Sequence, residues 1–549
     1  MALSGPVALV RPPVETHFKF SKLVESLALG YLAAALGEDG HEIVYIDSQL
    51  YGLSPVETAA RIMASGAPLV GFTLTHNHFP QQVVEIFDIL ARDGFPGLCV
   101  VGGHAVSFFP ERVLDHVPRV DAVAIGEGER TIRRLAARLA AGEDWRTIPG
   151  IVARRDGGHV RTPPERETDL DLVPLPARDL TREVIRRDGI VAMATSRGCY
   201  ARCAFCSVPR FYGLDQGQAH AVGDWHCRSA EHMAMEVADL EARFGLRELL
   251  IVDDEFFGGT GAGFERAREF GRRLERQGSN VGFALSCRAE NVRADVLEDL
   301  RRGGLAHVFV GIEAGTAQSL KLYAKNHSTD QNREAIAAIK KLGLSFQAGY
   351  MLFNTHTTLD ELIANVAFLK DVGECKPAVL NSAVDPHFGT PMTRLMERKG
   401  AIVDEGLRLR AQLREPAVVT AQRVAWHAAE AFEPVMGMLA GLHSSITWEW
   451  RRKVPGRSPQ STRLIESFEA LANRRFTEVF EIALLRLQAG TRGDMVLAEA
   501  MESLEAVSEE LRLGAALLLV KVEEGDGQLR YLRQADLIGQ EHFPCAVHA

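Results

Sequence analysis

Three cysteines stand close together in the sequence, with three residues between Cys199 and Cys203 and two between Cys203 and Cys206. Eight cysteines spread at random over 549 positions would give this spacing only about 0.002 times, so chance is a poor explanation. Structural zinc needs four closed ligands, commonly two pairs; no second cysteine pair lies nearby, although His226 and Cys227 leave a zinc site as the alternative. Three thiolates on a four-iron cluster leave one iron open. The spacing therefore predicts an iron–sulfur cluster built for chemistry.

Charged and polar residues follow three of the apolar runs downstream of these cysteines. Consecutive carboxylates can hold an ammonium group, and an arginine can bind a carboxylate through two parallel hydrogen bonds. For each of these side chains, the alternative is a solvated loop charge or an ion pair within the fold. The residues are Asp253, Asp254, Glu255, Ser286, Arg288 and Glu313.

The segment from Thr195 to Ser207, which contains the three cysteines, resembles the cluster loop of the radical S-adenosylmethionine (SAM) superfamily. The resemblance implies a 4Fe-4S cluster on Cys199, Cys203 and Cys206, with the amino and carboxylate groups of SAM on the free iron. It also implies a 5'-deoxyadenosyl radical that abstracts a hydrogen atom, so that the cofactors carry the difficult step. An external electron donor of the flavodoxin or ferredoxin type is then expected.

The same resemblance implies roles for the polar residues. The family contacts the SAM amino group after its second strand, which is the position of residues 253–255. Ser286 and Arg288 end the third predicted strand, where an arginine would pair with the SAM carboxylate. Glu313 lies in a segment that matches the fourth-strand motif, where a polar residue approaches SAM.

Residues 186–400 alternate apolar, strand-like runs with helical patterns. This alternation predicts an α/β fold, a (β/α)6 partial TIM barrel with chemistry at the carboxyl ends of its strands. Ser229 and Thr329 are predicted helix N-caps, and glycines are predicted to end the helices in left-handed turns. The predicted strands are 191–195, 248–252, 281–285, 307–312, 345–351 and 378–384, and the helix-ending glycines are Gly245, Gly278, Gly303, Gly343 and Gly373.

Residues 1–150 have their own strand and helix alternation, which predicts a doubly wound, Rossmann-like parallel sheet. Such sheets bind ligands past the carboxyl ends of their strands, where this chain has paired glycines that let a large flat ligand approach the backbone. A nucleotide, or no ligand, remains an alternative on these grounds. The predicted strands are 6–10, 43–47, 69–73, 98–101 and 120–125.

The order of short motifs from Leu29 to Glu129 resembles the cobalamin-binding domain that is fused to many radical SAM enzymes. The Asp-x-His-x-x-Gly loop that supplies a histidine to cobalt in other cobalamin proteins is missing, so no ligation through that motif is expected. Our hypothesis is that the segment 75–78 lies near the lower corrin face; His76 or His78 capping the next helix is the alternative. The residues assigned to cobalamin are Thr73, His76, Gly102, Gly103, Gly126, Glu127 and Gly128.

Between and after these regions the composition changes. Residues 151–185 are rich in turn-forming residues and are predicted to be a linker. Residues 401–549 are predicted to form an all-helical domain. Its predicted helical stretches are 407–413, 420–442, 462–489 and 495–520.

The composition narrows the classes of partner. With 62 basic and 72 acidic residues, the net charge of -10 disfavours a nucleic-acid substrate. The sequence has no apolar run long enough to span a bilayer, and its first residues do not resemble a secretory signal, so a cytoplasmic location is expected.

The cofactor pair implied by these resemblances favours methylation of an unactivated carbon of a small molecule or natural-product intermediate. A radical rearrangement, cyclisation or ring contraction is the first alternative, and a non-catalytic cobalamin sensor is an alternative of another class. Methylthiotransferases share the cysteine loop but carry three further cysteines in the N-terminal domain, whereas only Cys99 precedes Cys199 here.

Overall fold

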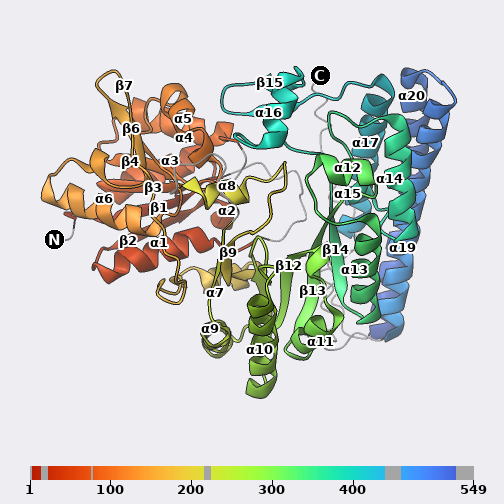
Figure 1. Ribbon diagram of the computed structural model, residues 1–549, viewed down its shortest axis with the longest axis horizontal. Helices are drawn as coiled ribbons and strands as arrows, with labels where there is room; N and C mark the ends of the chain where they lie inside the picture. Colours follow the sequence, from red (N-terminus) through yellow and green to blue (C-terminus); the bar gives the residue numbers. More distant parts are fainter. Residues whose placement is uncertain (1–2, 14–22, 76–77, 215–223, 439–458, 527–549) are drawn as a thin grey trace. The chain divides into compact units, whose positions relative to one another are not determined.

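The computed structural model describes residues 3–13, 23–75, 78–214, 224–438 and 459–526. Figure 1 labels the helices and strands of the described residues. The chain divides into two compact units. The first comprises Met1–Tyr350 and Val384–Gln412, and the second comprises Met351–Ala383 and Leu413–Ala549. The predicted cluster loop and the predicted cobalamin region therefore belong to the same unit.

A seven-stranded sheet forms the N-terminal part of the first unit, in the order β2-β1-β3-β4-β5-β6-β7. The first five strands pair in parallel, as predicted. Because β1 pairs with both β2 and β3, the strand order reverses there, and β3, β4 and β5 present their carboxyl ends along one edge. The strands are β1 (Val7–Arg11), β2 (Ile43–Asp47), β3 (Leu69–Thr73), β4 (Leu98–Gly102), β5 (Ala122–Ala124), β6 (Ile151–Arg155) and β7 (Gly158–Arg161).

The last two strands correct the sequence interpretation, because part of the expected linker belongs to this sheet. β6 pairs antiparallel with β5, and β7 pairs antiparallel with β6. Asp156 and Gly157 join β6 to β7 with φ values of 50° and 78°. Two consecutive positive φ values are typical of the tight hairpin turn that Asp-Gly favours, so the pair was a hairpin signal in the sequence.

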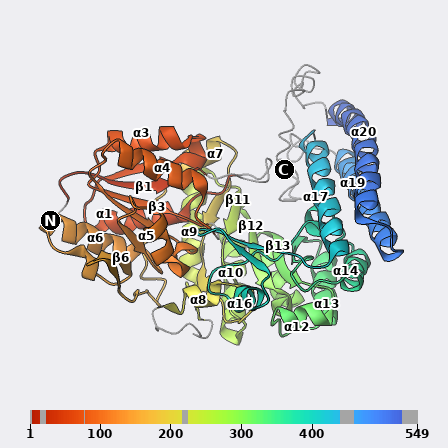
Figure 2. The same ribbon diagram turned by 90° about the horizontal axis from the view of Figure 1, so that it is seen from above.

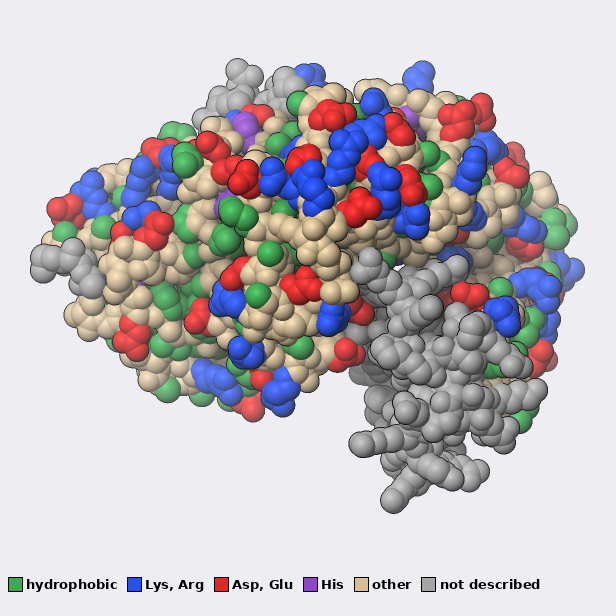
Figure 3. All heavy atoms as spheres, turned by 90° about the horizontal axis from the view of Figure 1, so that it is seen from below, with side chains coloured by type: hydrophobic (Ala, Val, Ile, Leu, Met, Phe, Trp, Pro, Cys, Tyr) green, Lys and Arg blue, Asp and Glu red, His purple; other side chains and the backbone are tan. Residues whose placement is uncertain are grey.

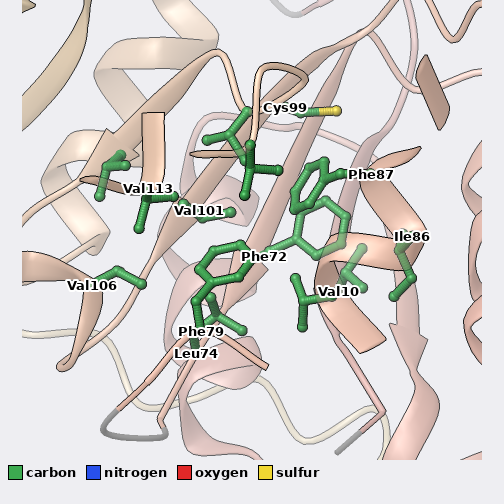
Figure 4. Packing of buried hydrophobic residues seen from close by; sticks show 14 of the residues in the cluster. Val10, Phe72, Leu74, Phe79, Ile86, Phe87, Cys99, Val101, Val106 and Val113 are labelled. Atoms are coloured by element: carbon green, nitrogen blue, oxygen red, sulfur yellow. The ribbon is translucent and has the colours of Figure 1, made fainter. Parts of the chain in front are cut away.

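Helices cover both faces of the sheet (Figure 2). Alternate residues of β1 enter two separate cores: Val7 and Leu9 pack with α1 and α6, whereas Val10 packs with α3, α4 and α5. In the second core, Phe72 of β3 and Phe87 of α4 have ring centroids 4.7 Å apart (Figure 4). The helices of this region are α1 (Leu27–Glu38), α2 (Ser48–Tyr51), α3 (Pro55–Ser65), α4 (Gln81–Arg92), α5 (Pro110–His116) and α6 (Glu129–Ala141).

The central sheet has five parallel strands in the order β14-β13-β12-β11-β8. A hairpin of β9 and β10 follows β8, and helices follow the later strands, as a partial barrel requires. The strands are β8 (Val191–Met193), β9 (Ser196–Gly198), β10 (Trp225–Cys227), β11 (Glu248–Ile251), β12 (Gly282–Arg288), β13 (Leu305–Glu313) and β14 (Ser345–Tyr350). The helices are α7 (Thr181–Arg186), α8 (Val208–Phe211), α9 (Ala230–Phe244), α10 (Gly261–Gln277), α11 (Ala294–Arg302), α12 (Ala317–Leu322), α13 (Thr329–Lys341) and α16 (Pro391–Arg398).

Three local predictions for the barrel need correction. The strand predicted at 378–384 is only a single parallel bridge between Phe353 and Ala383, because Pro377 begins the short helix α15 (Pro377–Leu380) instead. Ser328, rather than Thr329, caps α13, since its side chain and that of the residue three positions later form a capping box. The left-handed residue after α11 is Gly304, whereas Gly303 is still right-handed.

The second unit is helical. It includes residues 351–383, which the sequence analysis assigned to the barrel. Residues predicted as a helix at 407–413 instead contribute to a hairpin of β15 (Ile402–Asp404) and β16 (Leu409–Ala411), in the first unit. Within the described residues, no helix combines the length and apolar character needed to cross a membrane. The helices of the second unit are α14 (Leu359–Asp371), α15, α17 (Pro416–Met438), α19 (Pro459–Gln488) and α20 (Gly493–Asp526).

Candidate active site

The three clustered cysteines line one open cavity, the cysteine pocket, whose empty space including its mouth is about 820 Å³. They lie on the loop between β9 and α8, at the carboxyl ends of the barrel strands. The cavity brings them together with five of the six polar residues that the sequence predicted, and Glu255 is the exception. Those five are Asp253, Asp254, Ser286, Arg288 and Glu313.

Gly198 and Asp253 position the start of the cysteine loop. Gly198 has a φ of 87°, and a Cβ there would come within 2.0 Å of the Asp224 carbonyl oxygen, so only glycine fits. The Asp253 carboxylate accepts hydrogen bonds from the Thr195 backbone N–H at 2.6 Å and the Ser196 hydroxyl at 2.7 Å. The close backbone contact at Gly198 and the hydrogen bonds to Asp253 therefore fix the chain just before the cysteine loop begins.

The three consecutive carboxylates have different surroundings. Asp253 is buried against the cysteine loop, and Glu255 is buried behind the pocket, where it accepts from the Arg288 backbone N–H and from Asn291. Asp254 faces the cavity, and loss of hydration together with the charge of Asp253 raises its pKa to about 7. Asp254 is thus the member of the triplet that is placed to meet a cationic ligand.

Arg288 directs its guanidinium group at the cysteine loop. Its Nη1 donates to Cys203 Sγ at 3.0 Å, and its Nε donates to Glu290 Oε1 at 2.5 Å. The other oxygen of Glu290 lies 2.9 Å from Nδ1 of the buried His327. Burial by itself raises the pKa of Glu290, but His327 and Arg288 outweigh this and lower it to about 2. An ionised carboxylate therefore orients the arginine.

Glu313 pairs with a lysine that the sequence analysis missed. Glu313 ends β13 with a φ of 65°, next to a register shift in the pairing with β14. Its Oε1 lies 3.1 Å from the Nζ of Lys325, which is buried and also lines the cysteine pocket. A second missed residue in this lining is Cys287, which lies between the predicted Ser286 and Arg288. No local pattern marks Lys325, because it follows a separate helix.

The alternative to an iron–sulfur cluster was a zinc site completed by His226 and Cys227, which both lie in β10. His226 Nε2 lies 3.0 Å from Asp224 Oδ1, and Cys227 pairs with Ser196 across the β9–β10 hairpin. Neither residue lines the cysteine pocket. Among the residues that the structure describes, no three His, Cys, Asp or Glu side chains are grouped to hold a single metal ion.

A second open cavity, the glycine pocket, lies at the carboxyl ends of β3, β4 and β5, with an empty space of about 920 Å³ including its mouth. Glycines and apolar side chains form most of its lining, which suits a large flat ligand. Six of the seven predicted residues line it: Thr73, Gly102, Gly103, Gly126, Glu127 and Gly128. The seventh, His76, lies outside the described residues.

Gly103 and Arg197 shape the glycine pocket from two sides. Gly103 has a φ of 122°, and a Cβ there would lie 2.1 Å from the Leu74 carbonyl oxygen. Arg197, two residues before the first clustered cysteine, lines the same cavity and pairs with Glu127 at 2.9 Å and Glu129 at 2.6 Å. Its guanidinium also lies 5.2 Å from the centre of the Tyr31 ring. The sequence analysis did not assign Arg197, Tyr31 or Glu129 to the cobalamin site.

Two family models match consecutive parts of the chain. The B12 binding domain matches residues 18–136, which contain the strands β3, β4 and β5 of the glycine pocket, and the radical SAM superfamily matches residues 193–367, which contain the cysteine loop. Together the two matches span more than half of the chain. The chain is a cobalamin-dependent radical SAM enzyme. Its cofactors are a 4Fe-4S cluster, SAM and cobalamin.

Curated relatives of this enzyme have several activities in their names. An uncharacterized methyltransferase of Pyrococcus horikoshii is 28% identical, over 66% of this chain and 77% of its own. A 4'-phospho-dehydrooxetanocin synthase of Priestia megaterium is 25% identical, over 66% of this chain and 50% of its own. A hopanoid C-3 methylase of Methylococcus capsulatus is 29% identical, over 62% of this chain and 63% of its own.

A solved structure shares the fold of the enzyme over nearly its whole length. It is that of a cobalamin-dependent S-adenosylmethionine radical enzyme, OxsB, with aqua-cobalamin bound. The TM-score is 0.74 at 19% identity, and the match covers 97% of this chain and 83% of that chain. At this identity the likeness is evidence for the fold. It confirms the predicted order of an N-terminal B12-binding domain, a central radical SAM domain and a helical C-terminal region.

Proposed function

We propose that the enzyme methylates an unactivated carbon of a small molecule or natural-product intermediate. The observation that carries this proposal is that the cysteine pocket and the glycine pocket share one wall. The four-residue helix α8 contributes Val208 and Pro209 to the cysteine pocket and Phe211 to the glycine pocket. A substrate held beside α8 would be within reach of both cofactors. The relatives named as a methyltransferase and a methylase favour the same reaction.

In this proposal Cys199, Cys203 and Cys206 hold the 4Fe-4S cluster. Asp254 faces the cavity with its carboxylate and would bind the SAM ammonium group. Arg288 has its planar guanidinium fixed by Glu290 beside Cys203 and would bind the SAM carboxylate through parallel hydrogen bonds. Ser286 and Glu313 line the same cavity and complete the polar contacts.

The glycine pocket would hold cobalamin between the sheet edge and helix α8. Thr73 and the glycines at the ends of β4 and β5 leave room for the flat corrin to approach the backbone. Arg197 pairs with Glu127 and Glu129, and these three side chains form the charged part of the lining. When both cofactors are bound, SAM supplies the hydrogen-abstracting radical and cobalamin supplies the methyl group. The protein's part is to exclude water and to orient the substrate carbon toward both.

The test is anaerobic reconstitution of the full chain with iron, sulfide and cobalamin, followed by assay with methyl-labelled SAM. A reductant of the flavodoxin or ferredoxin type and a panel of small-molecule acceptors would be supplied. We expect comparable amounts of 5'-deoxyadenosine and S-adenosylhomocysteine, with label in a product. Cys203→Ala is the control and should form neither. Protein that assembles no iron–sulfur cluster would contradict the proposal.

A rearrangement, cyclisation or ring contraction is the second candidate, and the relative named as a synthase favours it. The same assay separates the two reactions by their SAM products. Formation of 5'-deoxyadenosine without S-adenosylhomocysteine, and without label in the product, would favour the rearrangement. A protein that binds cobalamin but forms neither SAM product with any acceptor would instead be the cobalamin sensor.

A further inference from the structure

A hydrogen bond between two loops connects the two cofactor pockets. His104 Nε2 lies 2.7 Å from Ser207 Oγ. His104 follows Gly103, which lines the glycine pocket, and Ser207 follows Cys206, which lines the cysteine pocket. The bond therefore joins the residue next to one cofactor site to the residue next to the other.

Helix α8 is a second connection between the two pockets. Ser207 is its N-cap, Val208 and Pro209 at its beginning line the cysteine pocket, and Phe211 at its end lines the glycine pocket. The ring of His104 stacks on Phe211 with centroids 4.6 Å apart. His104 thus contacts both ends of the helix that separates the pockets.

The N-cap of α8 departs from the usual arrangement. A serine at this position normally accepts a hydrogen bond from the second or third helical residue, but Ser207 makes no such bond. The second residue is Pro209, which has no N–H to offer, and the hydroxyl is bound to His104 instead. Burial lowers the pKa of His104 to about 4, so the ring is neutral near pH 7.

We propose that the His104–Ser207 hydrogen bond makes the binding of cobalamin and the binding of SAM cooperative. A ligand packed against Gly103 and Phe211 would hold His104 and α8 in one arrangement. Through Ser207 this would also hold the third cysteine and the start of α8 in the form that binds SAM. His104 and Ser207 are positioning residues, and the inference rests on the proposed assignment of the two pockets. Linkage requires each ligand to raise the affinity of the other by the same factor.

The test measures SAM affinity by equilibrium dialysis in cluster-loaded protein, with and without saturating aquacobalamin. We expect aquacobalamin to tighten SAM binding at least about five-fold in the unaltered enzyme, the lower end of typical coupling between sites. His104→Ala and Ser207→Ala should each reduce the effect below about two-fold. The double variant should lose no more than either single variant, because both remove the same bond.

The barrel contains a matched histidine–serine pair for control. His307 Nδ1 lies 2.8 Å from Ser345 Oγ, between β13 and β14, and neither residue lines a cofactor pocket. His307→Ala should therefore keep the cooperativity of the unaltered enzyme. The inference is overturned if aquacobalamin leaves SAM affinity unchanged in the unaltered enzyme, or if His104→Ala or Ser207→Ala keeps the full effect. Cooperative binding without any methylated product would contradict the proposed methylation but not the inferred coupling between the two pockets.

Discussion

At the scale of single residues, the cysteine pocket separates side chains that look equivalent in the sequence. Asp253, Asp254 and Glu255 are consecutive carboxylates, yet Glu255 lies outside the cavity, and of the two aspartates that line it Asp253 is buried under hydrogen bonds from Thr195 and Ser196. Arg288 is directed at a cysteine sulfur by a carboxylate two residues later. The chemistry of each group therefore follows from its partners rather than from its type.

Asp254 should make SAM binding depend on pH near neutrality. Its pKa is raised to about 7, so the carboxyl is partly protonated at pH 7, whereas the SAM ammonium group requires the ionised form. Acidification must then weaken binding, several-fold between about pH 7.5 and pH 6, because a proton has to leave first. Equilibrium dialysis of the cluster-loaded protein across this range measures the effect.

Asp254→Asn is the matched control for this prediction. It keeps the size of the side chain but removes both the charge and the titration, so SAM should bind more weakly with no such slope near pH 7. A flat profile for the unaltered enzyme would contradict the assigned role of Asp254.

At the scale of secondary structure, helix α4 packs against the sheet whose strand ends line the glycine pocket. Its buried residues pack on one face of the N-terminal sheet, and Phe87 lies fully buried beside Phe72 of β3. The strand that carries Phe72 ends at Thr73, which lines the pocket. Packing in this core thus positions the edge to which a ligand binds.

Phe87→Ala should destabilise the N-terminal sheet by about 3–5 kcal/mol, because it removes a buried ring and leaves a cavity. Hydrogen exchange of β1 and β3 amides would measure the loss. Glu85→Ala, at an exposed position of the same helix, should change stability by less than about 0.5 kcal/mol. Equal effects of the two substitutions would mean that this core does not support the sheet.

At the scale of the whole molecule, the first unit joins two domains through pairs of charged side chains. Arg197 of β9 pairs with Glu127 and Glu129 of the B12-binding domain, and all three side chains are less than one fifth exposed. On the face drawn in Figure 3, by contrast, Lys and Arg side chains lie interspersed with Asp and Glu side chains. The Arg197 contact is therefore a specific connection between the two domains.

Arg197→Met should cost about 3–5 kcal/mol of stability and weaken cobalamin binding, because it leaves two partly buried carboxylates without their cation. Burial already raises the pKa of Glu127, and loss of Arg197 would raise it further. Urea unfolding and dialysis with aquacobalamin would measure the two effects. Adding Glu127→Gln and Glu129→Gln should restore part of the stability. An Arg197→Met variant as stable as the unaltered enzyme would contradict this account.

Local patterns in the sequence predicted most strands of both sheets and a cluster on three cysteines, and the resemblance of its motifs to two families implied the other cofactors and the order of the domains. The cluster site could be recognised from the cysteine spacing because its three ligands lie on one short loop and need no partner from a distant part of the chain. The strands of the N-terminal sheet were predictable because both of its faces are buried, which requires continuous apolar runs. The sixth barrel strand was predicted wrongly because Pro377 begins a short helix within the apolar run. Part of the predicted linker was wrong because its Asp156-Gly157 turn joins two strands of the N-terminal sheet.

Only the tertiary structure decided which residues connect the two pockets. His104 and Ser207 are 103 residues apart in the chain, and Arg197 and Glu129 are 68 apart. Such contacts depend on how two domains pack, and packing leaves no periodic signal in either segment. The ion pair between Lys325 and Glu313 was likewise not predictable, because it depends on the path of α12, which lies between the two residues. The sequence therefore specified the cofactors, and the folded chain specified how their sites are joined.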